Sequence, residues 1–231
     1  MMDLPAGFEN RCKQFLDDFL KAVGEFHTLL SGNKIFQRRT QGIGRISAAD
    51  AIDWGLSGPC LRGSGVNLDI RRANPYCGYE KYDFEVPTEP DGDVWARYMV
   101  RMREMKESHK ISVQALSRLR PGPVKADDPK VVLPDREAMK THMDALIHHF
   151  LIIAEGFNVP AGEVYHPIEA SKGELGVYMK SDGGPKPSRV HFRGPSFVNL
   201  SALPVLAKGE MVADVVAIIG SLDIVLGEID R

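Results

Sequence analysis

The chain ends on Ser221-Leu-Asp-Ile-Val-Leu-Gly-Glu-Ile-Asp-Arg231, shortly after the apolar residues 212–219. An apolar terminus left in water would fray and expose sticky surface, so we expect this segment to fold back into the body of the protein. A carboxylate inside such a segment needs a partner, because burying an unpaired charge is costly. Asp223 and Arg231 are therefore candidate members of a buried polar cluster. The simpler alternative is a terminal segment that docks for packing alone.

The bulk composition is that of a soluble globular protein. Of the 231 residues, 43% are hydrophobic and 26% are charged, and the length fits one large domain or two small ones. A formal net charge of −2 offers no basic excess to neutralise phosphates, so no nucleic-acid partner is expected. No apolar run reaches the roughly 18 residues that span a bilayer, and residues 1–7 do not resemble a secretory signal. Any membrane association is therefore expected to be peripheral.

The cysteines and histidines do not predict a metal site. Cys12, Cys60 and Cys77 are an odd number at wide spacing, without a C-x-x-C pair, which favours reduced thiols over a disulfide framework or a zinc site. The histidines of residues 142–149 lack the i, i+4 spacing of H-E-x-x-H.

Apolar periodicity predicts a mainly helical protein. Apolar residues recur three or four apart over residues 8–30, 93–119 and 137–155, which predicts three long amphipathic helices. Shorter helices are expected at residues 200–207 and 212–220. On the helix of residues 93–119, we expect the basic side chains to lie mostly away from the centre of the apolar stripe: Arg97, Arg101, Arg103, Lys106 and Lys110.

The remaining segments predict loops and a few strands. Residues 42–77 are dense in glycine and are expected to be rich in loops. Residues 175–179 and 189–193 predict two strands that flank the turn at 181–185, and residues 79–86 predict one further short strand. The expected fold class is α+β, with a helical core and a small antiparallel β region in one domain.

One internal stretch, Gly58-Pro-Cys-Leu-Arg-Gly-Ser-Gly-Val-Asn-Leu-Asp-Ile-Arg-Arg72, has an unusual composition. Its glycines permit a tight loop that could present Arg62. The stretch lacks the lysine of the G-x-x-x-x-G-K-S/T loop, and Ser47 replaces the third glycine of a G-x-G-x-x-G pattern nearby, so no nucleotide site is predicted. It resembles the GPxLRxSGVxxDxR segment of the hydrogenase-like subunit of respiratory complex I, the proton-pumping NADH:quinone oxidoreductase.

Two further blocks carry the same resemblance. Glu169-Ala-Ser-Lys-Gly-Glu-Leu-Gly176 is similar to the EAPRG-type loop that places a basic residue beside the metal site of nickel–iron hydrogenases, and Lys172 holds that position here. A cation there could stabilise a developing quinol oxyanion or orient a carboxylate. The alternative is a surface loop before a strand. The other block is Arg193-Gly-Pro-Ser-Phe-Val-Asn-Leu200, for which we expect a structural role.

The ending of the chain resembles the same family. Nickel–iron hydrogenases typically carry Asp-Pro-Cys-x-x-Cys here, and both cysteines bind the metals. Aligned on Asp223, this chain has Val225 and Glu228 in place of the two cysteines. Thiolates are the soft ligands that such a site requires, and valine cannot coordinate a metal. The resemblance therefore implies the hydrogenase large-subunit fold without its metal site.

The resemblance covers residues 1–231, which we take as the C-terminal part of one hydrogenase-large-subunit-like domain. Members of the family are longer, and the tyrosine and histidine thought to bind the quinone headgroup lie in the N-terminal part that is missing here. The resemblance implies that the chain forms one wall of a quinone pocket, with quinone as the substrate and no metal bound by this chain. Electrons would arrive from an iron–sulfur cluster in a neighbouring subunit, so the chain is not expected to be active alone.

The resemblance also implies roles for individual residues. Asp223 is expected to be a polar group of the wall and a candidate for proton supply, and Val225 and Leu226 are expected to contact the quinone ring or tail. Arg231 is expected to anchor the C-terminal turn through Asp223 or Asp230. The residues expected to support the pocket are Arg62, Glu169, Lys172 and Arg231.

The expected partners are other complex I subunits: the iron–sulfur subunit beside the pocket, other peripheral-arm subunits, and the membrane-arm subunit at the pocket entrance. The expected location is peripheral, on the cytoplasmic side of the bacterial inner membrane or the matrix side in mitochondria. Two alternatives remain open. One is the large subunit of an energy-converting hydrogenase relative, against which the absence of both C-terminal cysteines argues. The other is a truncated or split-gene product that only scaffolds neighbouring subunits.

Overall fold

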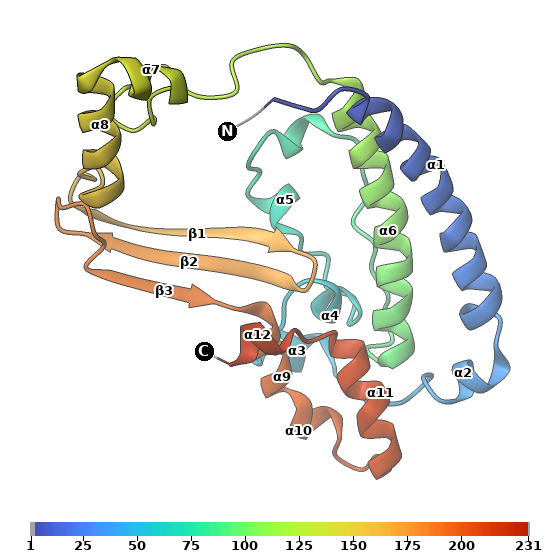
Figure 1. Ribbon diagram of the computed structural model, residues 1–231. Coiled ribbons are helices and arrows are strands. Elements are labelled where there is room, and N and C mark those ends of the chain that lie inside the picture. Colours follow the sequence, from blue (N-terminus) through green and yellow to red (C-terminus); the bar gives the residue numbers. More distant parts are fainter. Residues whose placement is uncertain (1–2, 231) are drawn as a thin grey trace. The chain divides into compact units, whose positions relative to one another are not determined.

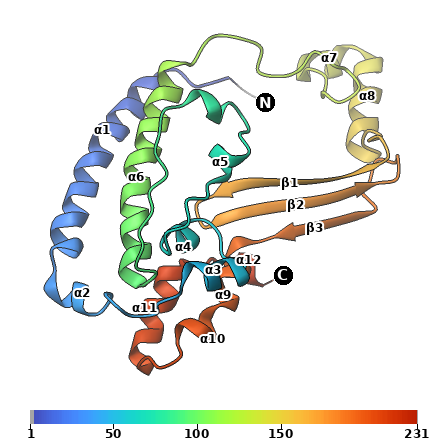
Figure 2. The same cartoon turned by 180° about the vertical axis from the view of Figure 1, so that it is seen from behind.

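The computed structural model describes residues 3–230 and combines many helices with one three-stranded sheet (Figures 1 and 2). The α+β fold class is confirmed. The chain divides into two compact units. The larger unit consists of Gly7–Leu119, Pro167–Gly176 and the chain from Arg193 onward. The smaller unit consists of the chain up to Ala6, Arg120–His166 and Val177–Phe192. The assignment to a single hydrogenase-like domain stays a prediction.

Two long helices run side by side in the larger unit (Figure 1). Helix α1 spans Phe8–Phe26 and continues as the π-helical segment η1, His27–Ser31, while helix α6 spans Val94–Ser117. Asp93 caps the start of helix α6, because its carboxylate accepts a hydrogen bond of 2.7 Å from the Ala96 backbone amide. Both helices were expected from the sequence, and both are confirmed.

The faces that these helices bury differ from the expected stripes. The apolar period over residues 8–30 includes Phe15 and Val23. Helix α1 buries Val23, together with Leu16, whereas Phe15 is 63% exposed. Helix α6 buries Met102, as expected, but it also buries Arg97, whose exposed fraction is 1%. The prediction that Arg97 lies away from the buried stripe is therefore wrong.

The glycine-rich residues 42–77 contain short helices that the sequence analysis did not identify. Helices α3, α4 and α5 span Ala48–Asp53, Pro59–Arg62 and Ile70–Ala73, and helix α2, Lys34–Arg38, precedes them. Side-chain caps begin several of them, as where Ser47 Oγ accepts from the Asp50 amide at 3.1 Å. Such single turns have too few residues to show an apolar period, which is why the sequence predicted only loops.

The strand predicted at residues 79–86 is wrong. Tyr79–Lys81 forms a short 3₁₀ helix, η2, and residues 82–86 lie outside any strand. The Tyr79 ring packs edge-on against Phe84 at 6.4 Å between centroids, and the Arg72 guanidinium lies 4.0 Å from the centroid of the Phe84 ring. The partial alternation of aromatic residues therefore reflects a packed aromatic cluster and not backbone pairing.

The smaller unit contains helices α7, Arg136–Thr141, and α8, Met143–Ala154. The sequence predicted one continuous helix over residues 137–155, but His142 is extended, with φ −124° and ψ 121°, and breaks it. Gly156, with φ +83°, lies just beyond the end of α8 and its C-cap Glu155. The wide apolar face of α8 is at the surface, since Phe150 is 65% exposed.

The sheet has the order β1-β2-β3, with strands at Gly162–Ala170, Gly173–Ser181 and Arg189–Arg193. Strands β2 and β3 contain the two strands predicted from the sequence. Strand β1 was not predicted as a separate element. Residues of β1 and β2 belong to both compact units.

The C-terminal segment forms helices α9, α10, α11 and α12 at Pro195–Ser201, Leu203–Leu206, Val212–Leu222 and Leu226–Ile229. The expected helix at 200–207 is therefore split, with Ala202 between α9 and α10. The core of the larger unit joins this segment to the glycine-rich stretch and includes these buried residues: Ile46, Leu56, Cys60, Leu61, Val94, Leu206, Ile218 and Leu222. No helix among the described residues is long and apolar enough to cross a membrane.

Two glycines allow the β1–β2 turn to lie directly against the start of α4. A Cβ atom added to Gly58, which has a φ of +62°, would lie 2.8 Å from the backbone nitrogen of Gly173. Ser57 Oγ accepts from the Glu174 amide at 3.0 Å, and the Asn199 side chain donates to the Lys172 carbonyl at 3.1 Å. Close backbone approach and these hydrogen bonds hold the turn, and with it Lys172, in place.

We expect Gly58→Ala to destabilise the protein more than Gly42→Ala. Both glycines have positive φ, and Gly58, with φ 62° and ψ −143°, lies in a region that only glycine readily adopts, so its backbone cost is about 1–3 kcal/mol. A Cβ atom at Gly42 meets nothing within 4 Å, whereas the one at Gly58 meets the Gly173 backbone. Overpacking of this kind costs about 1–3 kcal/mol more. Urea denaturation of both variants measures the difference, and equal losses would contradict the close approach.

Candidate functional site

Asp223 directly follows helix α11 in a left-handed conformation, with φ 57° and ψ 50°. Aspartate tolerates this conformation better than most residues, and it turns the chain sharply out of the buried helix. Its Oδ2 atom forms an ion pair with Lys172 Nζ and lies 3.4 Å from Arg101 Nε. The structure thus brings together the β1–β2 turn, helix α6 and the end of α11. We call these three residues, Lys172, Arg101 and Asp223, the Asp223 site.

The pairing of Lys172 with Asp223 joins two residues that the sequence analysis singled out separately. Lys172 was expected to stabilise an oxyanion or to orient a carboxylate, and the carboxylate beside it is that of Asp223. The Asp223 side chain is 37% exposed, so it is partly open to an incoming molecule. The ion pair between Lys172 and Asp223 is therefore partly buried.

Arg101 was not identified from the sequence. Its Nη1 donates to the Arg97 carbonyl at 3.1 Å, and its Nη2 lies 3.8 Å from Cys60 Sγ. Its Nε is the atom nearest Asp223, at 3.4 Å from Oδ2, and forms an ion pair but no hydrogen bond with it. The only available signal was its position four residues after Arg97 on the same helix, which places the two on one face.

Arg97 is a further cation near Asp223, and unlike Arg101 it is fully buried. Its guanidinium donates to Ser221 Oγ at 2.9 Å, to the Gly92 carbonyl at 2.9 Å and to the Gly44 carbonyl at 3.0 Å. Burial lowers the pKa of Arg97 to about 10, and the neighbouring charge of Arg101 acts in the same direction. Arg97 therefore fastens α6 to the end of α11, two residues before Asp223.

Arg62 is the centre of a second charged group, which also includes Asp69, Arg71, Glu104 and Glu169. Only 1% of Arg62 is exposed. Its Nε donates to Glu104 Oε1 at 2.7 Å, and its Nη1 donates to Glu169 Oε1 at 2.9 Å. Burial lowers the pKa of Arg62, but the nearby carboxylates, Glu104 and Glu169 foremost, outweigh burial and raise it. We call these five residues the Arg62 cluster.

The other carboxylates of the Arg62 cluster are firmly held. Glu169 Oε2 accepts from the Ile70 amide at 3.1 Å, so both oxygens of Glu169 are bound. Asp69 accepts two hydrogen bonds from Arg71, at 3.0 Å from Nε and 2.6 Å from Nη2. Burial raises the pKa of Asp69. The hydrogen bonds and the charge of Arg71 lower it by more than that, so the pKa lies below its ordinary value.

A cavity of about 570 Å³ in the larger unit is lined by residues of both charged groups. Arg62, Glu104 and Glu169 line it together with Arg101 and Asp223. Its apolar lining comes from Phe19, Met102 and Met105 and is joined by the Tyr98 ring. Arg71 also lines the cavity, which therefore has apolar surface next to three arginines and three carboxylates.

Comparison with known proteins decides the family. Residues 1–231 match the family described as the 49 kDa subunit of respiratory-chain NADH dehydrogenase. The chain belongs to this family. The resemblance read from the sequence is thereby confirmed.

The relatives include three bacterial subunits of NADH-quinone oxidoreductase. The one from Citrifermentans bemidjiense is 57% identical over 229 residues, which are 99% of this chain and 59% of that protein. One from Koribacter versatilis is 54% identical over 230 residues, which are 100% of this chain and 57% of that protein. The one from Geobacter sulfurreducens is 55% identical over 229 residues, with shares of 99% and 59%. The chain thus spans somewhat over half the length of these relatives.

In this member of the 49 kDa subunit family, the residues after Asp223 turn outward. Val225 is 44% exposed and Leu226 is 74% exposed, and neither lines the cavity. At the position of the second hydrogenase cysteine, Glu228 Oε2 accepts from the Ser196 amide at 3.0 Å and ties α12 to α9. Arg231 lies outside the described residues, so its anchoring role stays a prediction.

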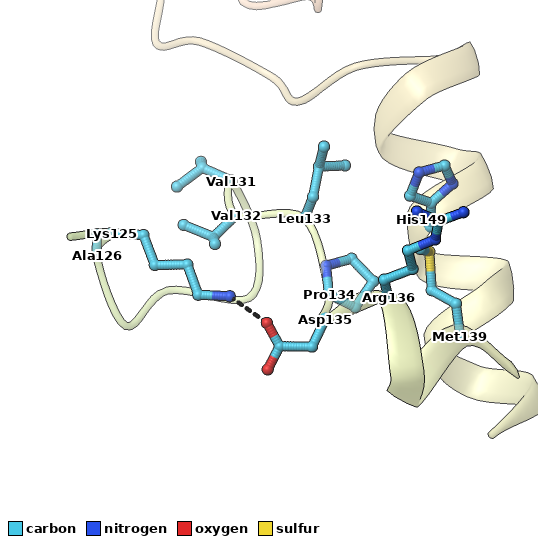
Figure 3. A pocket seen from close by; sticks show the side chains of 10 residues that line it. All are labelled: Lys125, Ala126, Val131, Val132, Leu133, Pro134, Asp135, Arg136, Met139 and His149. Atoms are coloured by element: carbon cyan, nitrogen blue, oxygen red, sulfur yellow. Dashed lines mark hydrogen bonds and ion pairs between the residues drawn. The ribbon is translucent and has the colours of Figure 1, made fainter. Parts of the chain in front are cut away.

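Within residues 3–230, no group of three or more histidine, cysteine, aspartate or glutamate side chains is arranged to hold a metal ion. A larger cavity of about 680 Å³ lies in the smaller unit, where Lys125 and Asp135 pair at 2.7 Å near Met139 and His149 (Figure 3). It is lined by none of the residues that were expected to form or support the quinone pocket.

We expect Asp69→Asn to reduce acid sensitivity while lowering stability at neutral pH. The folded-state pKa of Asp69 lies below the ordinary value of 3.8, so its carboxylate contributes stability that is present above pH 3.8. That stability is lost as the pH falls through the folded-state pKa. The free energy of unfolding at pH 7 should fall by about 1–3 kcal/mol, and its decline below pH 4 should be shallower.

The matched control is Asp18→Asn, which removes a surface ion pair with Lys21. The Asp18 side chain is 61% exposed. This variant should leave the free energy of unfolding nearly unchanged, because water screens an exposed ion pair. Equal effects of the two substitutions at pH 7 would show that the Arg62 cluster does not stabilise the fold.

Proposed function

We propose that this chain forms one wall of the quinone-reducing pocket of a proton-pumping NADH:quinone oxidoreductase. The Asp223 site is the part of that wall which faces the quinone headgroup. The observation that carries this proposal is the ion pairing of Asp223 with Lys172 and Arg101, where Asp223 and Arg101 line a cavity that also has apolar lining. It is joined by membership of a family whose relatives are named as NADH-quinone oxidoreductase subunits.

The chemistry of quinone reduction fits this arrangement. A quinone takes up two electrons and two protons to become a quinol, and negative charge develops on its oxygens as the electrons arrive. Lys172 and Arg101 supply two cations that stabilise such charge. Asp223 holds both cations in place and can pass a proton to a quinone oxygen. Its partial exposure leaves room for that contact.

The apolar residues suit the rest of the molecule. Phe19, Met102 and Met105 line the cavity and can pack against a flat ring, and methionine adapts its shape readily. Val225 and Leu226 project exposed apolar surface just after Asp223, where a ring or tail can contact them. These contacts would orient the substrate without stabilising any one charge state.

The proposal also assigns the partners. Electrons come from an iron–sulfur cluster held by a neighbouring subunit, and the remaining pocket wall comes from other parts of the complex. The chain acts as the C-terminal part of a hydrogenase-large-subunit-like domain, bound peripherally on the cytoplasmic or matrix side of the membrane through other subunits. It is not active alone.

The test is Asp223→Asn in the full-length subunit, measured as NADH-driven quinone reduction in the assembled complex. We expect turnover to fall at least about tenfold, because a group that positions or donates a proton typically contributes about a hundredfold or more. Assembly should survive, because asparagine keeps an oxygen that can accept the hydrogen bond from Lys172.

The matched control is Asp182→Asn, in the exposed turn after β2, which should leave turnover unchanged. A second variant, Lys172→Met, removes one cation and should lower turnover as well. Normal turnover of both Asp223→Asn and Lys172→Met in assembled complex would contradict the pocket role and favour the scaffold alternative.

A further inference from the structure

The Arg62 cluster holds more acids than bases. Asp69, Glu104 and Glu169 are three carboxylates, whereas Arg62 and Arg71 are two guanidinium groups. The side chains of Arg62, Asp69 and Glu169 are each exposed by 5% or less. Arg101 of α6 adds a third guanidinium beside these acids, so a proton would be kept only on the carboxylate that is desolvated but bound most weakly.

Glu104 is the carboxylate best placed to hold that proton. Both oxygens of Glu169 and both of Asp69 accept hydrogen bonds. Glu104 accepts only one among the described residues, at Oε1 from Arg62 Nε. Its side chain is 17% exposed and lines the cavity, so water can reach its other oxygen. Burial also raises the pKa of Glu104, against the opposing charges of Arg62 and Arg101.

Glu104 and Asp223 open into the same cavity. Arg101, which contacts Asp223, precedes Glu104 by three residues on α6, so both project from one face of that helix. The charged groups around Glu104 come from every element packed there: Arg62 from α4, Glu169 from β1, and Arg71 from α5. A chain of cavity waters between Glu104 and Asp223 would thus pass along Arg101.

We propose that Glu104 is a proton-relay residue that resupplies Asp223 during quinone reduction. The Glu104 carboxylic acid releases its proton through cavity water to the Asp223 carboxylate, which becomes the acid; no electrons move in this step. Glu104 is left as a carboxylate, which Arg62 stabilises through the hydrogen bond at 2.7 Å. Glu104 then regains a proton from solvent. This inference rests on the proposed function of the Asp223 site.

The experiment compares Glu104→Gln with Glu107→Gln in the assembled complex. Glu107 is one turn along the same helix, and its side chain is 12% exposed. Both its oxygens are bound, by Lys110 at 2.6 Å and by the Glu85 amide at 2.9 Å, and it does not line the cavity. The measurements are NADH-driven quinone reduction as a function of pH and the solvent deuterium isotope effect.

We expect Glu104→Gln to lower turnover about tenfold or more, with the loss growing as the pH rises, because protons must then come directly from solvent. Its solvent isotope effect should exceed that of the unaltered complex. Glu104→Asp should keep most of the turnover but move the alkaline limb of the pH profile to lower pH, since aspartate has the lower ordinary pKa. Glu107→Gln should behave like the unaltered complex.

An unchanged pH profile and isotope effect in assembled Glu104→Gln would overturn the relay, even where Asp223→Asn is impaired as proposed. Unchanged turnover in Asp223→Asn would instead overturn the relay, and unchanged turnover in Lys172→Met as well would overturn the proposed function. Where Glu104→Gln does not assemble, Glu104→Asp decides the question, because an unmoved alkaline limb in that variant contradicts the relay.

Discussion

The buried guanidinium of Arg62 is the interaction on which the larger unit depends most. A cation that is only 1% exposed is tolerated only where carboxylates and carbonyls surround it. Arg62 meets this condition by binding Glu104 of α6, Glu169 of β1 and the Leu68 carbonyl at 2.8 Å. Segments more than a hundred residues apart in sequence are thereby brought to one point.

Arg97 satisfies the same requirement in a different way. Its three hydrogen-bond partners are neutral oxygens, so its positive charge is solvated but not neutralised. With Arg101 and Lys172 it makes the surroundings of Asp223 positive. The buried Arg97 binds Ser221, which is two residues before Asp223. The burial of Arg97 therefore helps to position Asp223. The geometry of the site and the stability of the helix packing therefore have the same physical origin.

Sequence reasoning located part of the site. Arg62, Glu169, Lys172 and Asp223 were singled out through a resemblance, and the structure gathers all four around one cavity or in direct contact with its lining. It missed the residues of α6 that complete the site, Arg101 and Glu104. A helical stripe is read from apolar residues, so charged side chains are assigned to water, and only a partner from elsewhere in the chain can reverse that assignment.

Features that arise from neighbours along the chain were readable from the residues alone. These are the extents of α1 and α6, the strands β2 and β3, and the family. Caps, apolar periods and motif spacing are local, so they need no coordinates. Long-range contacts settled that Arg97 is buried, since it binds Ser221 and Gly44. They also settled that Lys172 meets Asp223. Each of these depends on which distant groups satisfy a charge, and those partners are chosen only when the chain folds.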